Sequence, residues 1–254
     1  MLRKLLLLSI LLSIFICSQA LAVKIDSLVL YLSFDEGAGD TVKDGSGNGN
    51  NGNITKAKWV NGKFSKALEF DGSASVEVAS SASLEALTDE ITILAWINPT
   101  LTGSAWQGVV TKGLDAVEHF ELLINTDAHI HTAWMFKQGR VVGDRLGKTL
   151  TAGKWSHLAV TYKPGEWIFY HNGVLVENNK SANSKLSPDG KPVVIGDEKG
   201  MSRFFTGIID EVAIFNKAIS ETDVNEYMNV GLTKVLSVES KDKLATTWAG
   251  LKSK

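Results

Sequence analysis

Short runs of β-branched and aromatic residues recur along most of this chain, and clusters of Gly, Asn and Asp separate them. Runs of this length, in which apolar and polar residues tend to alternate, are typical of strands with one face in a core. Many such strands in succession predict an all-β fold of two packed antiparallel sheets. The segments that fit best are 28–34, 91–97, 119–124, 130–136, 155–162, 167–170, 174–176 and 208–215.

The dipeptide Asn172-Gly173 predicts a tight hairpin. It lies between the apolar runs at 167–170 and 174–176. A two-residue type I′ turn needs positive φ at both central positions, and Asn followed by Gly adopts these angles most readily. We therefore expect two antiparallel strands joined at this dipeptide.

Only one segment has the pattern of a helix. Ser220 is a suitable N-cap, and Asp223 occupies the acidic position of a capping box three residues later. Val224 and Tyr227 are spaced to form an apolar stripe, and Gly231 is a typical stop signal. The expected fold class is therefore an all-β sandwich with one short C-terminal helix.

The first 22 residues have the order of a secretory signal peptide. Arg3 and Lys4 precede an apolar run at 5–16, and Ala20-Leu21-Ala22 fits a cleavage site. The run is shorter than the roughly 20 residues that a membrane-spanning helix needs. We expect a signal peptide at 1–22, one domain at 23–232 and a C-terminal tail at 233–254. The protein is then secreted or held at the cell surface, and an uncleaved signal segment is the only membrane contact expected.

Charge and cysteine content argue against two classes of protein. The chain has 26 Lys and Arg against 28 Asp and Glu, with no clustered basic run. A nucleic-acid-binding protein needs such a cluster to neutralise phosphates, so nucleic acid is not an expected partner. The single cysteine, Cys17, lies in the predicted signal segment, so the mature domain is expected to have neither a disulfide nor a cysteine nucleophile.

Five stretches in a fixed order carry a family resemblance: residues 30–37 with 44–48, 62–72, 91–99, 155–162 with 170–173, and 207–220. They include Phe-Asp-Gly at 70–72, Ala-Trp-Ile-Asn-Pro at 95–99 and Gly-Ile-Ile-Asp-Glu-Val at 207–212. The ordered set resembles laminin-G-like domains of the concanavalin A-like lectin/glucanase superfamily. The resemblance implies a jelly roll of two antiparallel sheets, often with a structural calcium ion, in which binding is more common than catalysis.

The resemblance also implies where calcium would bind. A hard cation takes six to eight oxygen ligands from carboxylates, amides and carbonyls. Asp44 and Asn48 lie in a Gly-rich loop that offers such oxygens, and Asp71 and Asp210 are similar to positions near the family's ion. The alternative is ordinary turn chemistry, in which Asp and Asn side chains bond nearby backbone groups. We expect calcium at these four residues.

The acidic residues lack the spacing of a glucanase active site. In hydrolases of this fold the catalytic carboxylates share one face of a strand, two residues apart, and flank the sugar bond. Asp210 and Glu211 are adjacent, and Val212 and Ala213 follow, so the two carboxylates are expected on opposite faces. The chain also has no Gly-x-Ser-x-Gly or His-Glu-x-x-His motif. We expect a non-catalytic domain, with a glycoside hydrolase of dispersed acids as the alternative.

Tryptophans are candidate sugar-binding residues, because an indole can pack against the apolar face of a pyranose ring. Trp96 and Trp155 lie in strands within the resembling segments, so we expect them in the core. Trp106 is expected in the loop after Pro99, and Trp134 lies near two histidines. We expect Trp106 and Trp134 to contact a ligand.

Polar residues near Trp134 complete the expected ligand site. Asp127, His129 and His131 alternate, so on a strand they would project from one face. This spacing is compatible with a transition-metal site and also with a polar ligand-binding face. We expect His129 and His131 to contact the ligand, together with Arg140 and Asp144 from the following loop.

These expectations combine into one functional hypothesis. The chain is expected to be an exported, non-catalytic recognition domain that binds a carbohydrate or an extracellular protein through loops at one edge of the sandwich. A structural or adhesion module without a small ligand is the main alternative, for which the C-terminal tail would supply the contact.

Overall fold

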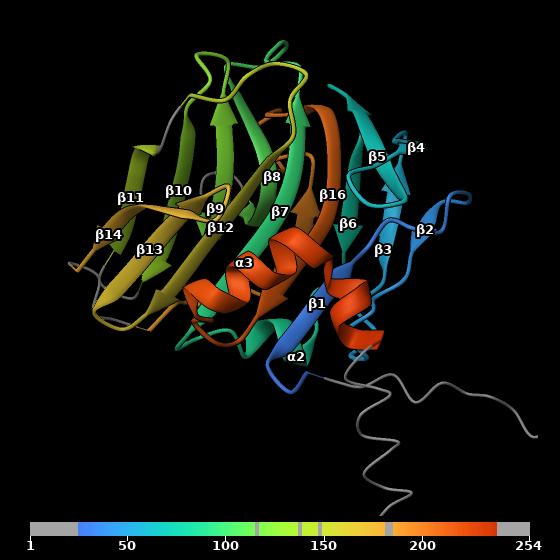
Figure 1. Ribbon diagram of the computed structural model, residues 1–254. Coiled ribbons are helices and arrows are strands. Elements are labelled where there is room, and N and C mark those ends of the chain that lie inside the picture. The colour runs from blue at the N-terminus through green and yellow to red at the C-terminus, as the bar shows by residue number, and fades with distance from the viewer. Residues whose placement is uncertain (1–24, 115–116, 137–138, 147–148, 181–184, 238–254) are drawn as a thin grey trace, which may run out of the picture.

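Two antiparallel sheets of eight strands each, stacked face to face, make up most of the molecule (Figure 1). The computed structural model describes residues 25–114, 117–136, 139–146, 149–180 and 185–237. The predicted two-sheet sandwich is confirmed. The expected signal peptide at 1–22 and residues 238–254 of the expected tail lie outside the described residues.

One sheet, called sheet A, lies in front in Figure 1. Its strands are β1 (Leu28–Leu32), β4 (Lys58–Asn61), β5 (Lys66–Asp71), β7 (Ile91–Pro99), β12 (Ser156–Lys163), β13 (Glu166–His171), β14 (Val174–Asn179) and β16 (Thr206–Phe215). They run in the order β14-β13-β12-β7-β16-β5-β4, and β1 also pairs with β16. The predicted hairpin is confirmed, since β13 and β14 meet at Asn172 and Gly173, whose φ values are 51° and 75°.

Sheet B lies behind sheet A in the same view. Its strands are β2 (Thr41–Val42), β3 (Gly52–Thr55), β6 (Ser75–Val78), β8 (Trp106–Leu114), β9 (Val117–Asn125), β10 (Ile130–Phe136), β11 (Gly139–Leu146) and β15 (Val193–Ile195). They run in the order β11-β10-β9-β8-β15-β6-β3-β2. Strands β11 to β8 are consecutive hairpin neighbours, whereas β15 pairs with β8 and β6 from distant parts of the chain.

The main core lies between the sheets and includes Trp134. This side chain is fully buried, with ring centroids 6.4 Å from Phe120 and 5.9 Å from Tyr162. Apolar residues at every second position of the strands face this layer, as the predicted alternation requires. Burying such aromatic side chains is a major source of the sandwich's stability.

A helix covers part of the outer face of sheet A (Figure 1). Helix α3 (Glu221–Val230) begins at Ser220, where the predicted capping box with Asp223 is present. Its Tyr227 stacks on Phe215 of β16 with ring centroids 5.6 Å apart. Residues 232–237 are also helical, and Leu232, Val235 and Leu236 pack on the same apolar cluster.

A short helix that the sequence analysis did not predict closes one end of the sandwich. Helix α2 (Ala82–Glu85) is capped by Ser81, whose side chain accepts a hydrogen bond from the backbone of Leu84. Glu85 at its end forms an ion pair of 2.7 Å with Lys112 of β8. The Lys112 side chain is fully buried and also lies 2.6 Å from Asp189.

A β-bulge in β16 overturns the prediction that Asp210 and Glu211 face opposite sides. The register against β7 shifts between residues 210 and 213, and Glu211 has a φ of 52°. Asp210 accepts backbone hydrogen bonds of 2.8 and 3.0 Å from Lys63 and Phe64, in the turn between β4 and β5. Glu211 accepts a hydrogen bond of 2.8 Å from the hydroxyl of Tyr31 and one of 3.1 Å from the backbone N–H of Leu232, just after α3. Asp210 and Glu211 therefore both point to the outer face of sheet A, because the extra residue of the bulge breaks the alternation of side chains.

Trp96 and Trp155 are not in the core between the sheets. Ile97 and Ala95 face that core, so Trp96 points outward from β7. The β4–β5 turn buries it, with the Phe64 ring 6.4 Å away and the Lys63 ammonium 4.2 Å above the indole. Trp155 packs edge-on against Trp96 and remains half-buried. Trp96 is therefore buried as expected, although on the outer face of sheet A, whereas the expectation of a core position is wrong for Trp155.

Candidate ligand-binding site

The outer face of sheet B brings together several of the residues that the sequence singled out. On β9, Phe120, Leu122 and Ile124 face the core, so Glu121 and Asn125 point outward. The strand register then places other outward side chains beside them. Trp106 of β8 is opposite Asn125, and His131 of β10 is opposite Leu123.

Trp106, His131 and Glu121 form a contacting row on this face. The rings of Trp106 and His131 meet edge-on at a centroid distance of 5.0 Å. The Nε2 atom of His131 lies 3.0 Å from the Oε1 atom of Glu121, and both side chains are almost completely buried. Because the carboxylate fixes the imidazole and the imidazole supports the indole, Trp106 is held in one orientation. Trp106 itself is only half-buried, so part of its ring remains open to a ligand.

The turn between β9 and β10 forms one border of the row. His129 donates its backbone N–H to the side chain of Asn125 over 2.8 Å, and Asn125 donates its own to the carbonyl of His129 over 3.0 Å. The imidazole of His129 lies 3.2 Å from the carboxylate of Asp127. Strand β10 begins at Ile130, so Asp127 and His129 lie in the turn and do not share a strand face with His131.

A loop at residues 196–205 forms the opposite border and lies directly on β8. Gly108 donates its backbone N–H to the carbonyl of Arg203 over 2.7 Å, and Thr111 donates to the carbonyl of Asp197 over 2.9 Å. A Cβ atom at Gly108 would be 2.4 Å from the carbonyl carbon of Asp197, so this close approach requires glycine. Arg203 and Glu198 form an ion pair of 2.8 Å within the loop.

The structure separates the predicted ligand residues into three groups. Trp106 and His131 lie together on the outer face of sheet B, with His129 at its edge. Trp134 lies on the opposite face of its strand, in the core, which removes it from any site on the outer surface. Arg140 and Asp144 belong to strand β11, so the expectation that they lie in a loop is wrong, and their side chains lie outside the described residues.

Sequence reasoning missed Glu121, Asn125 and the 196–205 loop. The alternation of β9 indicates that Glu121 and Asn125 share a face, but the identity of the neighbouring strands is needed to place His131 beside them. The loop has no sequence pattern that indicates where it packs. Gly108 is the one local signal, since glycine within a strand marks a close backbone approach.

The Asp44 loop is held by hydrogen bonds within the protein. The Asp44 carboxylate accepts backbone N–H groups from residues 31, 46 and 50, over 2.9 to 3.0 Å, and the hydroxyl of Ser46 over 2.7 Å. Asn48 directs its amide nitrogen, a donor, at the carbonyls of residues 28 and 29. These N–H and O–H donors occupy the oxygen lone pairs that a cation would need. The loop therefore has the chemistry of a turn that is stabilised by its own side chains.

Asp71 and Asp210 do not join Asp44 in a metal site. Asp71 accepts the backbone N–H and hydroxyl of Ser73 in the turn after β5, whereas Asp210 binds the β4–β5 turn. Within the ranges that the structure describes, no group of three or more His, Cys, Asp or Glu side chains is arranged to hold a metal ion. The four residues expected to bind calcium therefore do not fit one shared ion.

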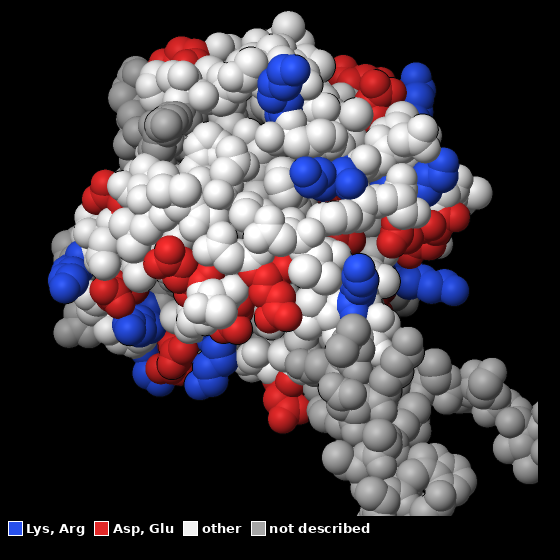
Figure 2. Space-filling model, viewed as in Figure 1, with Lys and Arg blue, Asp and Glu red and all other residues white. Residues whose placement is uncertain are grey.

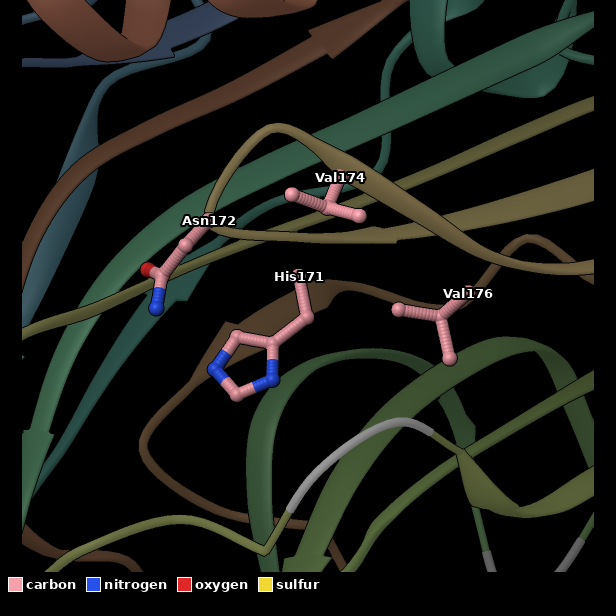
Figure 3. Close-up of a pocket in the computed structure, with 4 residues that line it drawn as sticks. All are labelled: His171, Asn172, Val174 and Val176. Atoms are coloured by element: carbon pink, nitrogen blue, oxygen red, sulfur yellow. The ribbon is translucent and has the colours of Figure 1, made fainter.

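A hollow also lies beside the β13–β14 hairpin, on sheet A (Figure 3). His171, Asn172, Val174 and Val176 line it, as Figure 3 shows. Asn172 is engaged elsewhere, because its side-chain oxygen accepts the backbone N–H of His157 over 2.8 Å. With two valines and one imidazole, this hollow offers fewer polar contacts than the face around Trp106.

The architecture described above is that of a jelly-roll β sandwich. The chain belongs to the concanavalin A-like lectin/glucanases superfamily, whose laminin-G-type sequence model matches residues 70–225. The family resemblance expected from the sequence is therefore confirmed. Among curated proteins, no match was found.

Solved structures with this fold include two binding domains and one domain of an extracellular arabinanase. The binding domain of Paraclostridial Mosquitocidal Protein 1 superposes with a TM-score of 0.63 and 18% identity, over 80% of this chain and 52% of that one. Domain 4 of AbnA, a GH43 extracellular arabinanase from Geobacillus stearothermophilus solved with arabinotriose, gives 0.62 and 19%, over 80% and 98%. The botulinum neurotoxin serotype G binding domain gives 0.62 and 13%, over 79% and 50%. The chain thus spans about half the length of the two toxin structures.

None of the helices in the described part of the chain has the length and apolar character needed to span a bilayer.

Proposed function

We propose that this domain is an exported, non-catalytic carbohydrate-binding module whose ligand lies against Trp106 on the outer face of sheet B. The observation that carries the proposal is the half-buried indole of Trp106, held in place by the His131–Glu121 pair. Such a site combines an apolar ring for stacking with polar groups for sugar hydroxyls. The arabinanase domain solved with arabinotriose has the same fold over 98% of its length, which supports a saccharide as the ligand.

The positions of the acidic residues support a binding role without catalysis. Asp210 binds the β4–β5 turn and is fully buried, and Glu211 accepts hydrogen bonds from Tyr31 and Leu232 and is 7% exposed. Neither carboxylate can flank a glycosidic bond at the surface. Glu121 on the candidate face is fully buried and contacts His131, so it serves to position the imidazole.

A glycan array followed by calorimetry tests the proposal. Replacing Trp106 with alanine removes the stacking surface and is expected to weaken binding by about 2 kcal/mol, or about 30-fold. Trp155→Ala is the matched control, because Trp155 is also half-buried but lies on the outer face of sheet A. An array without any bound glycan, or equal losses in both variants, would refute the proposed site.

A further inference from the structure

A second hollow lies on the outer face of sheet A, on the other side of the sandwich from Trp106. It is bounded by β12, β13 and the segment that leads into α3. It has a volume of about 300 Å³, comparable with small-ligand pockets. It is lined by residues of both strands and of the segment before α3, which are Thr161, Lys163, Glu166, Ile168, Tyr170, Ala218, Ile219 and Ser220. We call this hollow the α3 groove. Figure 2 shows acidic and basic side chains near one another in this part of the outer face of sheet A.

The floor of the α3 groove is a flat strip of two strands. Val160 and Phe169 face the core, so their neighbours Thr161, Ile168 and Tyr170 point outward into the groove. Thr161 and Ile168 are directly opposite each other in the β12–β13 pairing. Half-buried Ile219 forms a wall beside this strip. The groove therefore offers an apolar surface about the width of one strand pair.

Two hydroxyl groups on this floor have no protein partner. Neither the Thr161 nor the Tyr170 hydroxyl forms a hydrogen bond with any residue that the structure describes, although both side chains are only 3% exposed. Neither hydroxyl oxygen is among the fully buried polar atoms that lack a partner, so both oxygens remain open to solvent at the groove. Burial raises the pKa of Tyr170, and Glu221 and Glu166 raise it further, so the hydroxyl stays a donor. Both groups are thus available to a bound molecule.

The charges around the α3 groove disfavour an anion. Glu166 is held by Lys163 at 3.1 Å and by the amide of Asn178 at 3.1 Å. Glu221 lies close enough to raise the pKa of Tyr170 and has no ion-pair partner among the described residues. At the start of α3, the backbone N–H of Asp223 already donates to the side chain of Ser220, so the capping box occupies a donor that an anion would need. An acidic ligand would meet two carboxylates and one paired lysine.

We propose that the α3 groove is a second carbohydrate site, specific for a neutral sugar ring. The ring packs on Ile168 and Ile219, and its hydroxyls accept from Thr161 and Tyr170 and donate to Glu166. Only the class of ligand rests on the proposed function. The site itself lies on the other sheet from Trp106.

NMR titration of the Trp106→Ala protein tests the groove with the sheet B site disabled. The probes are neutral arabino-, xylo- and gluco-oligosaccharides, with an oligogalacturonide as the acidic counterpart. We expect a neutral probe to shift the backbone amides at 161–170 and 218–219 in a saturable way. Adding Thr161→Val and Tyr170→Phe, which remove only the hydroxyls, should weaken this binding at least tenfold. Ala218→Phe, which fills the groove, should abolish it.

The outcomes separate the two sites. If no neutral probe shifts the groove amides, if the hydroxyl-deleted protein binds as before, or if the oligogalacturonide binds equally well, the second site is refuted. If wild-type and Trp106→Ala proteins bind alike and only the groove amides move, the second site stands and the sheet B proposal fails. If only amides near residue 106 move in the wild-type protein, the reverse holds.

Discussion

Lys112 is a buried cation whose removal should destabilise the sandwich. Its side chain is fully buried, and its ammonium lies 2.7 Å from Glu85, 2.6 Å from Asp189 and 2.8 Å from the carbonyl of Lys191. Lys112→Met keeps the aliphatic stem but leaves two carboxylates facing an apolar methyl group. Removing one partner of a buried ion pair costs about 3–5 kcal/mol.

The magnitude at this site should fall at the lower end of that range. The Asp189 and Glu85 side chains are 16% and 29% exposed, so water can partly replace the lost ammonium. We therefore expect a loss of about 3 kcal/mol, which corresponds to a fall in Tm of about 6–12 °C for a domain of this size. Urea unfolding followed by tryptophan fluorescence measures the loss as a lower midpoint with an unchanged m-value.

A surface lysine provides the control. Lys199 pairs with Glu77, but these side chains are 44% and 45% exposed, so Lys199→Met should change stability by less than about 0.5 kcal/mol. His119 gives an independent readout, because burial and then the charge of Lys112 lower its pKa to about 4. Lys112→Met should raise that pKa in an NMR titration. Equal midpoints for the two variants, with an unchanged His119 pKa, would refute the reasoning.

Three further predictions concern pH, calcium and the 196–205 loop. Burial raises the pKa of Asp210 to about 8 and that of Glu211 to about 7, above their unfolded values. The two protonated carboxyl groups therefore contribute their full stability at low pH, and this contribution is lost as the pH rises through 7 to 8. Between pH 5 and 9, the urea midpoint of Asp210→Asn should fall less steeply than that of the wild-type protein. Because hydrogen bonds within the protein occupy Asp44, melting in calcium and in EDTA should give the same Tm, and a large calcium-dependent rise would contradict this. Gly108→Ala should displace Asp197 and cost about 1–3 kcal/mol, with faster amide exchange at 196–205; unchanged exchange would show that the loop does not rest on Gly108.

Local patterns were sufficient for the β13–β14 hairpin, for helix α3 and for eight strands, which are β1, β7, β9, β10, β12, β13, β14 and β16. The Asn172-Gly173 turn and the Ser220 capping box depend on backbone angles and hydrogen bonds within a few residues, so the sequence indicates them directly. Helix α2 escaped prediction because, with four residues, it has no periodicity to recognise. The bulge at Glu211 escaped it because alternation assumes regular pairing, and β16 changes its edge partner from β5 to β1 at that point.

The candidate site was predicted in part. Trp106, His129 and His131 could be proposed from residue type, and two of them are in contact. Trp134 was misplaced because a tryptophan between polar neighbours can face either side of a strand, and the packing partner decides which. Glu121 and the α3 groove depend on residues far apart in the chain, and no local pattern joins them.

By itself, the sequence determined that this chain forms a β sandwich of the laminin-G type, since alternation, turn residues and motif order are properties of neighbouring positions. Only the tertiary structure decided which acidic residues are buried, which tryptophans reach the surface and which side chains share a face. Those outcomes depend on strand order and register, which bring together residues that are distant in the chain.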